Sequence, residues 1–120
     1  MAESKFKGNR RIDYDGKDQY FTKPDIAGYL VNKTKEIISF NGYDQILEPS
    51  AGSGAFLDYL PEDKRIGIDI DPQREDIIEQ DFFKYSTDKS TLTIGNPPFG
   101  IRNKLSIQFF NHAATFSDTI

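Results

Sequence analysis

A stiff turn directly after a short strand is the feature that most constrains the fold of this chain. Residues 91–94 form a β-branched run typical of a buried strand, and the next six residues, 95–100, include Pro97 and Pro98. Proline cannot donate to a sheet ladder and breaks a helix interior, so the strand has to end there. In open α/β sheets, ligands bind at the carboxyl ends of the strands. The turn is therefore either a plain strand ending with a packed Phe99 or part of a ligand site.

Three further apolar runs upstream have the same strand character. They predict strands at 45–48, 65–70 and 77–80, with a Gly-rich loop and a short helix at 55–60 after the first of them. A longer helix should begin after Thr22, its predicted cap, and stop near residues 41–42, and a last helix should begin near Asn103. The apolar face of the longer helix would comprise Ile26, Ala27, Leu30, Val31, Thr34, Ile37 and Ile38. Strand, loop, helix and strand imply right-handed crossovers, so we predict an α/β fold with a partial sheet of about four parallel strands and flanking helices.

Composition restricts the chain to a small domain without disulfides. It has 120 residues, no cysteine and no run of the roughly 20 apolar residues needed to span a membrane. We expect a mobile polar arm over residues 1–19, a single domain over 20–120, and a cytoplasmic location without membrane contact. The net charge is −4, yet residues 1–35 carry eight Lys or Arg against five Asp or Glu. The basic start fits either phosphate contact or a solvated tail.

Four polar side chains stand where the four predicted strands end: Glu48, Asp69, Asp81 and Asn96. The loop after Glu48 contains Gly52 and Gly54, and glycines let a backbone approach a ligand closely. It lacks the Gly-Lys-Ser/Thr of a phosphate loop, and Leu57 stands where a dinucleotide loop would have its third glycine. An acidic residue here suits a cationic or amine-bearing ligand. Asp69 could bind ribose hydroxyls or cap a turn, and Asp81 could bind an adenine amino group or face water.

These motifs together resemble the S-adenosylmethionine-dependent adenine-N6 DNA methyltransferases in which the cofactor motifs precede the catalytic one. Residues 20–24 resemble the element before the first sheet strand, and residues 48–54 the acidic-Pro-x-x-Gly-x-Gly loop. Residues 67–72 resemble the ribose-binding motif and residues 80–82 the adenine-binding motif. Residues 96–99, Asn-Pro-Pro-Phe, match the catalytic (D/N/S)-Pro-Pro-(Tyr/Phe) motif. The resemblance covers about residues 20–100 and implies a partial Rossmann-like class I methyltransferase fold.

The resemblance also implies a cofactor, a target and a set of site residues. The cofactor is S-adenosyl-L-methionine and the target is adenine in DNA, with no metal required. Cofactor binding falls to Tyr20, Thr22, Glu48, Pro49, Ser50, Ala51, Gly52, Gly54, Asp69, Ile70, Asp81 and Phe82, with Ile70 or Phe82 against the purine. Catalysis falls to Asn96, Pro97, Pro98 and Phe99: the Asn96 side-chain oxygen and the Pro97 carbonyl would accept from the N6 amino group, and Phe99 would stack on the extruded base.

The chain departs from this family in length. A complete fold of the type has seven strands, and residues 117–120 read as the start of a fifth. We therefore expect either a fragment or a chain that completes its sheet with a second chain, or by self-association, at an exposed edge of strand 91–94. Three alternatives stay open: a non-catalytic cofactor-binding or assembly module, and methylation of RNA or of a protein glutamine instead of DNA.

Overall fold

The computed structural model describes residues 10–12, 18–20, 22–98 and 100–120. Its strands are β1 (Arg10–Ile12), β2 (Asp18–Tyr20), β3 (Gln45–Glu48), β4 (Arg65–Asp69), β5 (Ile78–Glu79) and β6 (Thr91–Thr93). Its α-helices are α1 (Pro24–Ile37) and α2 (Lys104–Ala113). Short 3-10 turns lie at η3 (Phe40–Gly42), η4 (Leu57–Tyr59), η5 (Phe82–Lys84) and η6 (Ile101–Asn103). None of the helices in these ranges is long and apolar enough to cross a membrane.

Four of the strands form one parallel sheet in the order β5-β4-β3-β6. Every neighbouring pair is parallel, so the carboxyl ends of all four strands meet at one edge. The chain folds in a partial Rossmann-like α/β arrangement, as the sequence predicts, and the β4–β5 connection is too short to hold a helix. The predicted helix at 55–60 is only the single turn η4.

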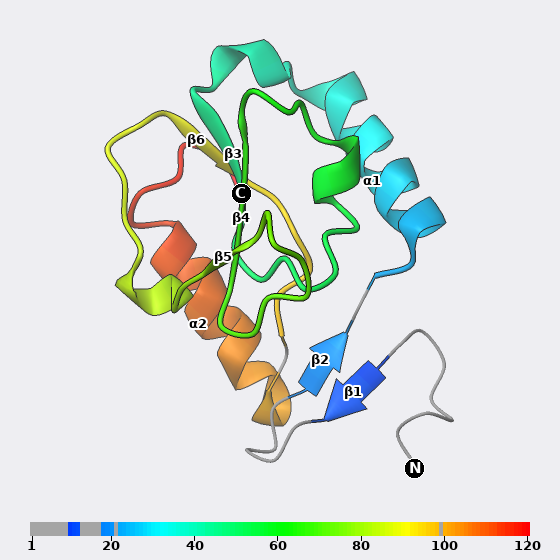
Figure 1. Cartoon of the computed structure of the whole chain (residues 1–120). Helices are drawn as coiled ribbons and strands as arrows, with labels where there is room; N and C mark the ends of the chain where they lie inside the picture. Colours follow the sequence, from blue (N-terminus) through cyan, green and yellow to red (C-terminus); the bar gives the residue numbers. More distant parts are fainter. Residues whose placement is uncertain (1–9, 13–17, 21, 99) are drawn as a thin grey trace.

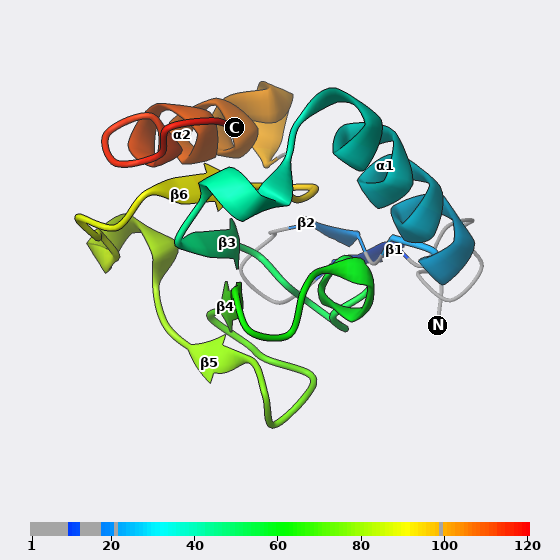
Figure 2. The same cartoon turned by 90° about the horizontal axis from the view of Figure 1, so that it is seen from above.

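Helices cover both faces of this sheet, and each face has its own apolar core. Figure 2 shows α1 and η4 on one side of the column of strands and η5 on the other, with α2 beside β6. The alternation along β3 divides the cores, because Ile46 packs with α1 and η4 whereas Leu47 packs with Phe82 and with Ala113 of α2. The sheet is thus the middle layer of three, with α1 on one side of the strands and α2 on the other (Figure 1).

Helix α1 differs from its prediction at both ends and along one side. Thr22 does not cap it: Lys23 is the N-cap residue and donates no side-chain bond, while Thr22 contacts Asn96 instead. The helix ends at Ile37, before the turn η3 that contains the predicted stop. The buried positions are Ala27, Gly28 and Val31, and Ile37 is 81% exposed. The apolar face is therefore narrower than predicted, because only small side chains fit between α1 and η4.

The edge of β6 is covered by this chain itself, so the expected exposed edge is wrong. After α2 the backbone returns beside β6 and forms a parallel bridge between Leu92 and Thr119. The Thr93 N–H donates to the Thr119 carbonyl at 2.9 Å, and the Asp118 N–H donates to the Thr91 carbonyl at 2.9 Å. The prediction that residues 117–120 lead into a further strand agrees with this pairing. The predicted association of a second chain at the β6 edge was inferred from an exposed edge, and the structure shows that edge paired within the chain.

A small hairpin-like pair precedes the sheet and was missed by the sequence analysis. Strands β1 and β2 pair antiparallel, with Arg10 opposite Tyr20. Strand β1 lies inside the segment 1–19 that was predicted as a mobile polar arm, and β2 overlaps its end. They were missed because three-residue strands leave no periodicity to detect. Phe99, assigned to base stacking, lies outside the described residues.

Candidate functional site

The carboxyl edge of the sheet brings together the residues that the sequence analysis predicted at strand ends. Glu48 ends β3 and Asp69 ends β4, and these two strands are hydrogen-bonded neighbours. Asn96 follows β6 on the other side of β3, and Asp81 follows β5 at the far end of the edge. The edge thus presents three carboxylates and one amide in a row, as parallel topology requires.

Asp69 holds the Gly-rich loop in place. Its side chain is only 6% exposed; Oδ2 accepts from the Gly52 N–H and Oδ1 from the Asp71 N–H, both at 2.8 Å. Gly52 and Gly54 have φ values of 56° and 84°, a left-handed region in which side chains with a Cβ are strained. Asp69 therefore acts as the cap of this loop, and any contact with a ribose would come in addition to those two bonds.

Glu48 is the opposite case, a buried carboxyl group in which one oxygen, Oε1, has no partner among the described residues. Its side chain is 2% exposed, and among the described residues no group donates to Oε1. Burial raises the pKa of Glu48 well above its ordinary value of 4.5; Asp69 and Asp58 raise it further, while the Leu57 backbone and Arg74 act against them. An unsatisfied buried oxygen costs free energy in the absence of a donor, so this position is suited to a donor from a ligand.

A small polar pocket lies directly beside Glu48. Its volume is about 10 Å³, room for a single water-sized group, and it is lined by Thr22, Glu48, Ser50, Ala51, Ser53, Ala55, Phe56 and Asn96. An ammonium group is of that size and donates hydrogen bonds, which matches the orphaned oxygen. The pocket joins the loop after β3, the segment before α1 and the turn after β6 into one site.

Asn96 connects the turn after β6 to both other segments. Its Nδ2 donates to Thr22 Oγ1 at 3.4 Å, and its backbone carbonyl accepts from Ser50 Oγ at 3.4 Å. Both distances are longer than the usual range for such hydrogen bonds, so both contacts are weak. With Nδ2 facing Thr22, the Oδ1 atom of the amide is the one placed to accept from another donor.

The residues predicted to hold a purine separate into two groups. Ile70 is 52% exposed beside Asp69 and is available to a flat ligand. Phe82 is 2% exposed, and its ring stacks on Phe109 at 4.9 Å between centroids, so of the two residues predicted for the purine face only Ile70 is exposed. Asp81 uses Oδ1 to accept from the Phe83 N–H, which makes it the cap of η5. The sequence analysis weighed only an adenine contact or exposure to water for Asp81, so it missed this capping role.

Arg74 is a residue of this site that the sequence analysis missed. It lies in the β4–β5 connection and pairs with Asp58 of η4 and with Asp76. Its guanidinium also lies against the Ser53 and Gly54 carbonyls of the Gly-rich loop. No sequence motif marks a single arginine in such a connection. Its role is visible only from its contacts with Ser53, Gly54 and Asp58, which lie sixteen or more residues away in the sequence.

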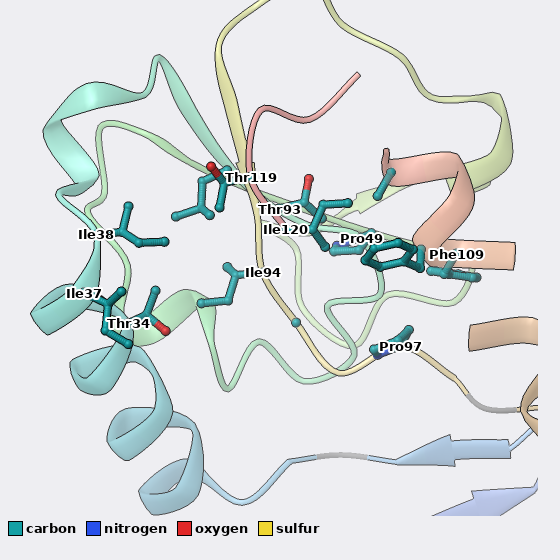
Figure 3. Close-up of a pocket in the computed structure, with 14 residues that line it drawn as sticks. Thr34, Ile37, Ile38, Pro49, Thr93, Ile94, Pro97, Phe109, Thr119 and Ile120 are labelled. Atoms are coloured by element: carbon teal, nitrogen blue, oxygen red, sulfur yellow. The ribbon is translucent and has the colours of Figure 1, made fainter. Parts of the chain in front are cut away.

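A second, apolar groove lies on the α1 side of β6 (Figure 3). Its volume is about 380 Å³, and Thr34, Ile37 and Ile38 of the α1 region face Ile94, Phe109 and Ile120 across it. Pro97 of the turn after β6 lines the same groove, and its neighbour Asn96 lines the polar pocket. The predicted catalytic turn therefore separates a polar pocket from an apolar one.

Comparison with known proteins relates the chain to methyltransferases. The chain is 26% identical, over 121 aligned positions, to a protein of Flavobacterium johnsoniae named ribosomal RNA small subunit methyltransferase A. The alignment covers 82% of this chain and 45% of the relative, so the chain spans less than half the length of that protein. No family model and no solved structure matches. The parallel sheet and this distant similarity together connect the chain with the methyltransferases, over part of their length.

Proposed function

We propose that this chain carries the cofactor site and the transfer site of an S-adenosylmethionine-dependent methyltransferase that acts on the N6 amino group of adenine in DNA. The single observation that carries the proposal is the orphaned carboxyl oxygen of buried Glu48 within a water-sized pocket shared with Asn96. The cofactor has an ammonium group at its methionine end, and the chain offers an unpaired acceptor of the right size and charge. The distant methyltransferase relative supports the same reaction class.

The residues at the edge fit the rest of that cofactor. Glu48, Thr22 and Ser50 would hold its methionine end, with the backbone of Pro49, Ala51, Gly52 and Gly54 passing close by. Asp69 and exposed Ile70 would contact the nucleoside, as would Asp81. When bound, S-adenosylmethionine supplies an activated methyl group on a sulfonium. The chain's task is to bind, to orient and to adjust the target amine.

The turn after β6 would adjust the amine. An adenine N6 lone pair is delocalised into the ring, so the nitrogen is a weak nucleophile. Hydrogen bonds from its two N–H groups to Asn96 Oδ1 and to the Pro97 carbonyl would draw it toward tetrahedral geometry. Pro97 and Pro98 stiffen the backbone that carries the carbonyl, so the acceptors are preorganised. The contact of Asn96 Nδ2 with Thr22 orients the amide for this role. The role of Phe99 as a stacking partner follows from the resemblance alone.

The test is methyl transfer from labelled cofactor to adenine-containing oligonucleotides, with Asn96→Ala as the variant. We expect Asn96→Ala to lower transfer at least about 100-fold, since it removes a transition-state acceptor. The loss of transfer should be much larger than any loss of cofactor affinity, because the amide oxygen contacts the substrate. Oligonucleotides in which adenine is replaced by a base without the amino group serve as the control. Transfer that persists in Asn96→Ala would contradict the proposed transfer site.

Methylation of adenine in RNA is the second candidate. The relative is named for ribosomal RNA, and nothing in the described site distinguishes ribose from deoxyribose at the target. The same assay with single-stranded DNA and RNA of one sequence decides between them. Cofactor binding without transfer to either strand would instead favour the non-catalytic module.

A further inference from the structure

Arg74 stands at the junction of the three segments that enclose the proposed cofactor site. Its Nη1 lies 2.8 Å from Asp58 Oδ1 of η4. Its Nε and Nη2 form a two-pronged contact with Asp76, at 2.9 and 2.6 Å. Its Nη1 also lies 3.4 Å from the Ser53 carbonyl and 3.5 Å from that of Gly54. One side chain thus spans the β4–β5 connection, the Gly-rich loop and η4.

The loop and the connection meet here along their backbones as well. The Gln73 N–H donates to the Gly52 carbonyl at 3.3 Å, next to Arg74. Gly52 is also the residue whose N–H is capped by Asp69. The guanidinium packs so closely on Gly54 that a Cβ there would lie 2.5 Å from Nη1. The Gly-rich loop is therefore held from two sides, by Asp69 within the site and by Arg74 outside it.

Such a contact is expected to contribute little to global stability. The side chains of Arg74, Asp58 and Asp76 are 29%, 58% and 49% exposed, and exposed pairs are screened by water. The planar fork of arginine nevertheless fixes direction as well as charge, which a lysine would not. A large geometric effect combined with a small stability effect is characteristic of a positioning group.

We propose that Arg74 is a positioning residue for the cofactor, holding the β4–β5 connection against the Gly-rich loop and η4. This rests on the proposed function, since the ligand held between those segments is S-adenosylmethionine. The charged groups that act on Glu48 are Asp69 and Asp58, which favour its protonated form, and Arg74, which favours the carboxylate. Arg74 therefore supports both the shape of the site and the anion that would bind the ammonium group.

The test is isothermal titration of the full chain with S-adenosylmethionine, comparing Arg74→Met, Arg74→Lys and wild type. We expect Arg74→Met to weaken binding about tenfold and Arg74→Lys to recover part of that loss. Lys33→Met is the matched control: it removes a cation from an exposed pair on α1, with Glu36, and should bind like wild type. Melting temperatures of all variants should agree within about 4 °C.

Measuring cofactor affinity over a series of pH values separates an electrostatic effect of Arg74 on the site from a merely structural role. Binding through the Glu48 carboxylate strengthens as pH rises through the pKa of Glu48. Removing Arg74 raises that pKa further, so the rise in affinity should move to higher pH in Arg74→Met and not in Lys33→Met. Wild-type affinity and an unmoved pH profile in Arg74→Met would overturn the inference. So would weakened binding that only parallels a lower melting temperature.

Hydrogen exchange of the cofactor-free chain tests the role of Arg74 independently of whether the chain binds S-adenosylmethionine. If wild type shows no binding, the proposed function fails, yet the role of Arg74 as a clamp is still tested. Faster exchange of the Gly52, Gly54 and Gln73 amides in Arg74→Met, with the sheet unaffected, supports the clamp. Unchanged exchange at these amides overturns it.

Discussion

The ends of β3 and β4 carry two buried carboxyl groups that this chain treats in opposite ways. Asp69 accepts two backbone N–H groups of its own chain, at Gly52 and Asp71. Glu48, on the adjacent strand, is buried as deeply, with no donor to Oε1 in the described part of the chain. The two positions share topology, charge type and burial, so the difference lies only in what the surrounding backbone offers.

That difference separates the framework of a site from its ligand contact. A carboxylate whose oxygens accept buried amides stabilises the folded chain and cannot be removed without leaving those amides unpaired. A buried carboxyl group with an unused oxygen destabilises the folded chain until a donor arrives. Asp69 therefore builds the loop, and Glu48 is the group that a cationic ligand would satisfy.

Asp69→Ala should have the largest effect. The free energy of unfolding should fall by about 2–4 kcal/mol, because two buried backbone N–H groups lose their acceptor. Denaturation in urea measures this. Asp69→Asn is the control: it keeps one acceptor oxygen, so its free energy of unfolding should fall by about half as much. A variant within about 0.5 kcal/mol of wild type would break the comparison, since Asp69 would then not be part of the framework.

Glu48→Gln should have the opposite profile. Cofactor affinity should fall about 30-fold, since a charged acceptor for an ammonium is replaced by a neutral one. The free energy of unfolding should be unchanged or higher by about 1 kcal/mol near neutral pH, because a buried group with a raised pKa is removed. Titration calorimetry and urea denaturation measure the two quantities. A stability loss as large as that of Asp69→Ala would mean that the backbone contact of Glu48 with Leu57 outweighs the cost of its unused oxygen.

The smallest expected effect is a dependence of the free energy of unfolding on pH, which we attribute to Glu48. The pKa of Glu48 is raised in the folded chain, so its contribution is complete below the unfolded pKa and is lost as pH rises through the folded value. Wild-type stability should therefore decline above the ordinary Glu range, by at most about 1.4 kcal/mol per pH unit. Urea midpoints between about pH 5 and pH 9 measure the slope. A slope that persists in Glu48→Gln would assign it to another group.

Several features of the fold were predictable because they depend on neighbours in sequence. The apolar runs and the two prolines located the strands of the sheet, and parallel pairing then required Glu48, Asp69, Asp81 and Asn96 to share one edge. The parallel direction of the strands follows from their right-handed crossover connections, whereas the order β5-β4-β3-β6 came from the structure. For the same reason the Gly-rich loop was recognisable as a close-approach turn.

Other features depended on contacts between distant residues. Phe82 looked available to a purine, yet Phe109, Phe116 and His112 of the last helical segment enclose its ring. Thr22 looked like a helix cap, yet it contacts Asn96 across 74 positions. The cover over β6 depends on the return of Thr119 after α2. Local patterns cannot show which of several apolar or polar partners a side chain meets.

The sequence by itself determined where strands end and which polar side chains stand there, because β-branched runs, glycines and prolines act on the backbone that bears them. Only the tertiary structure decided how each of those side chains is used. The carboxylate of Asp69 accepts from two backbone amides at 2.8 Å. Glu48 is buried as well, but among the described residues no donor reaches its Oε1. Hydrogen bonding acts over about 3 Å, so roles at a shared edge are set by packing rather than by residue type.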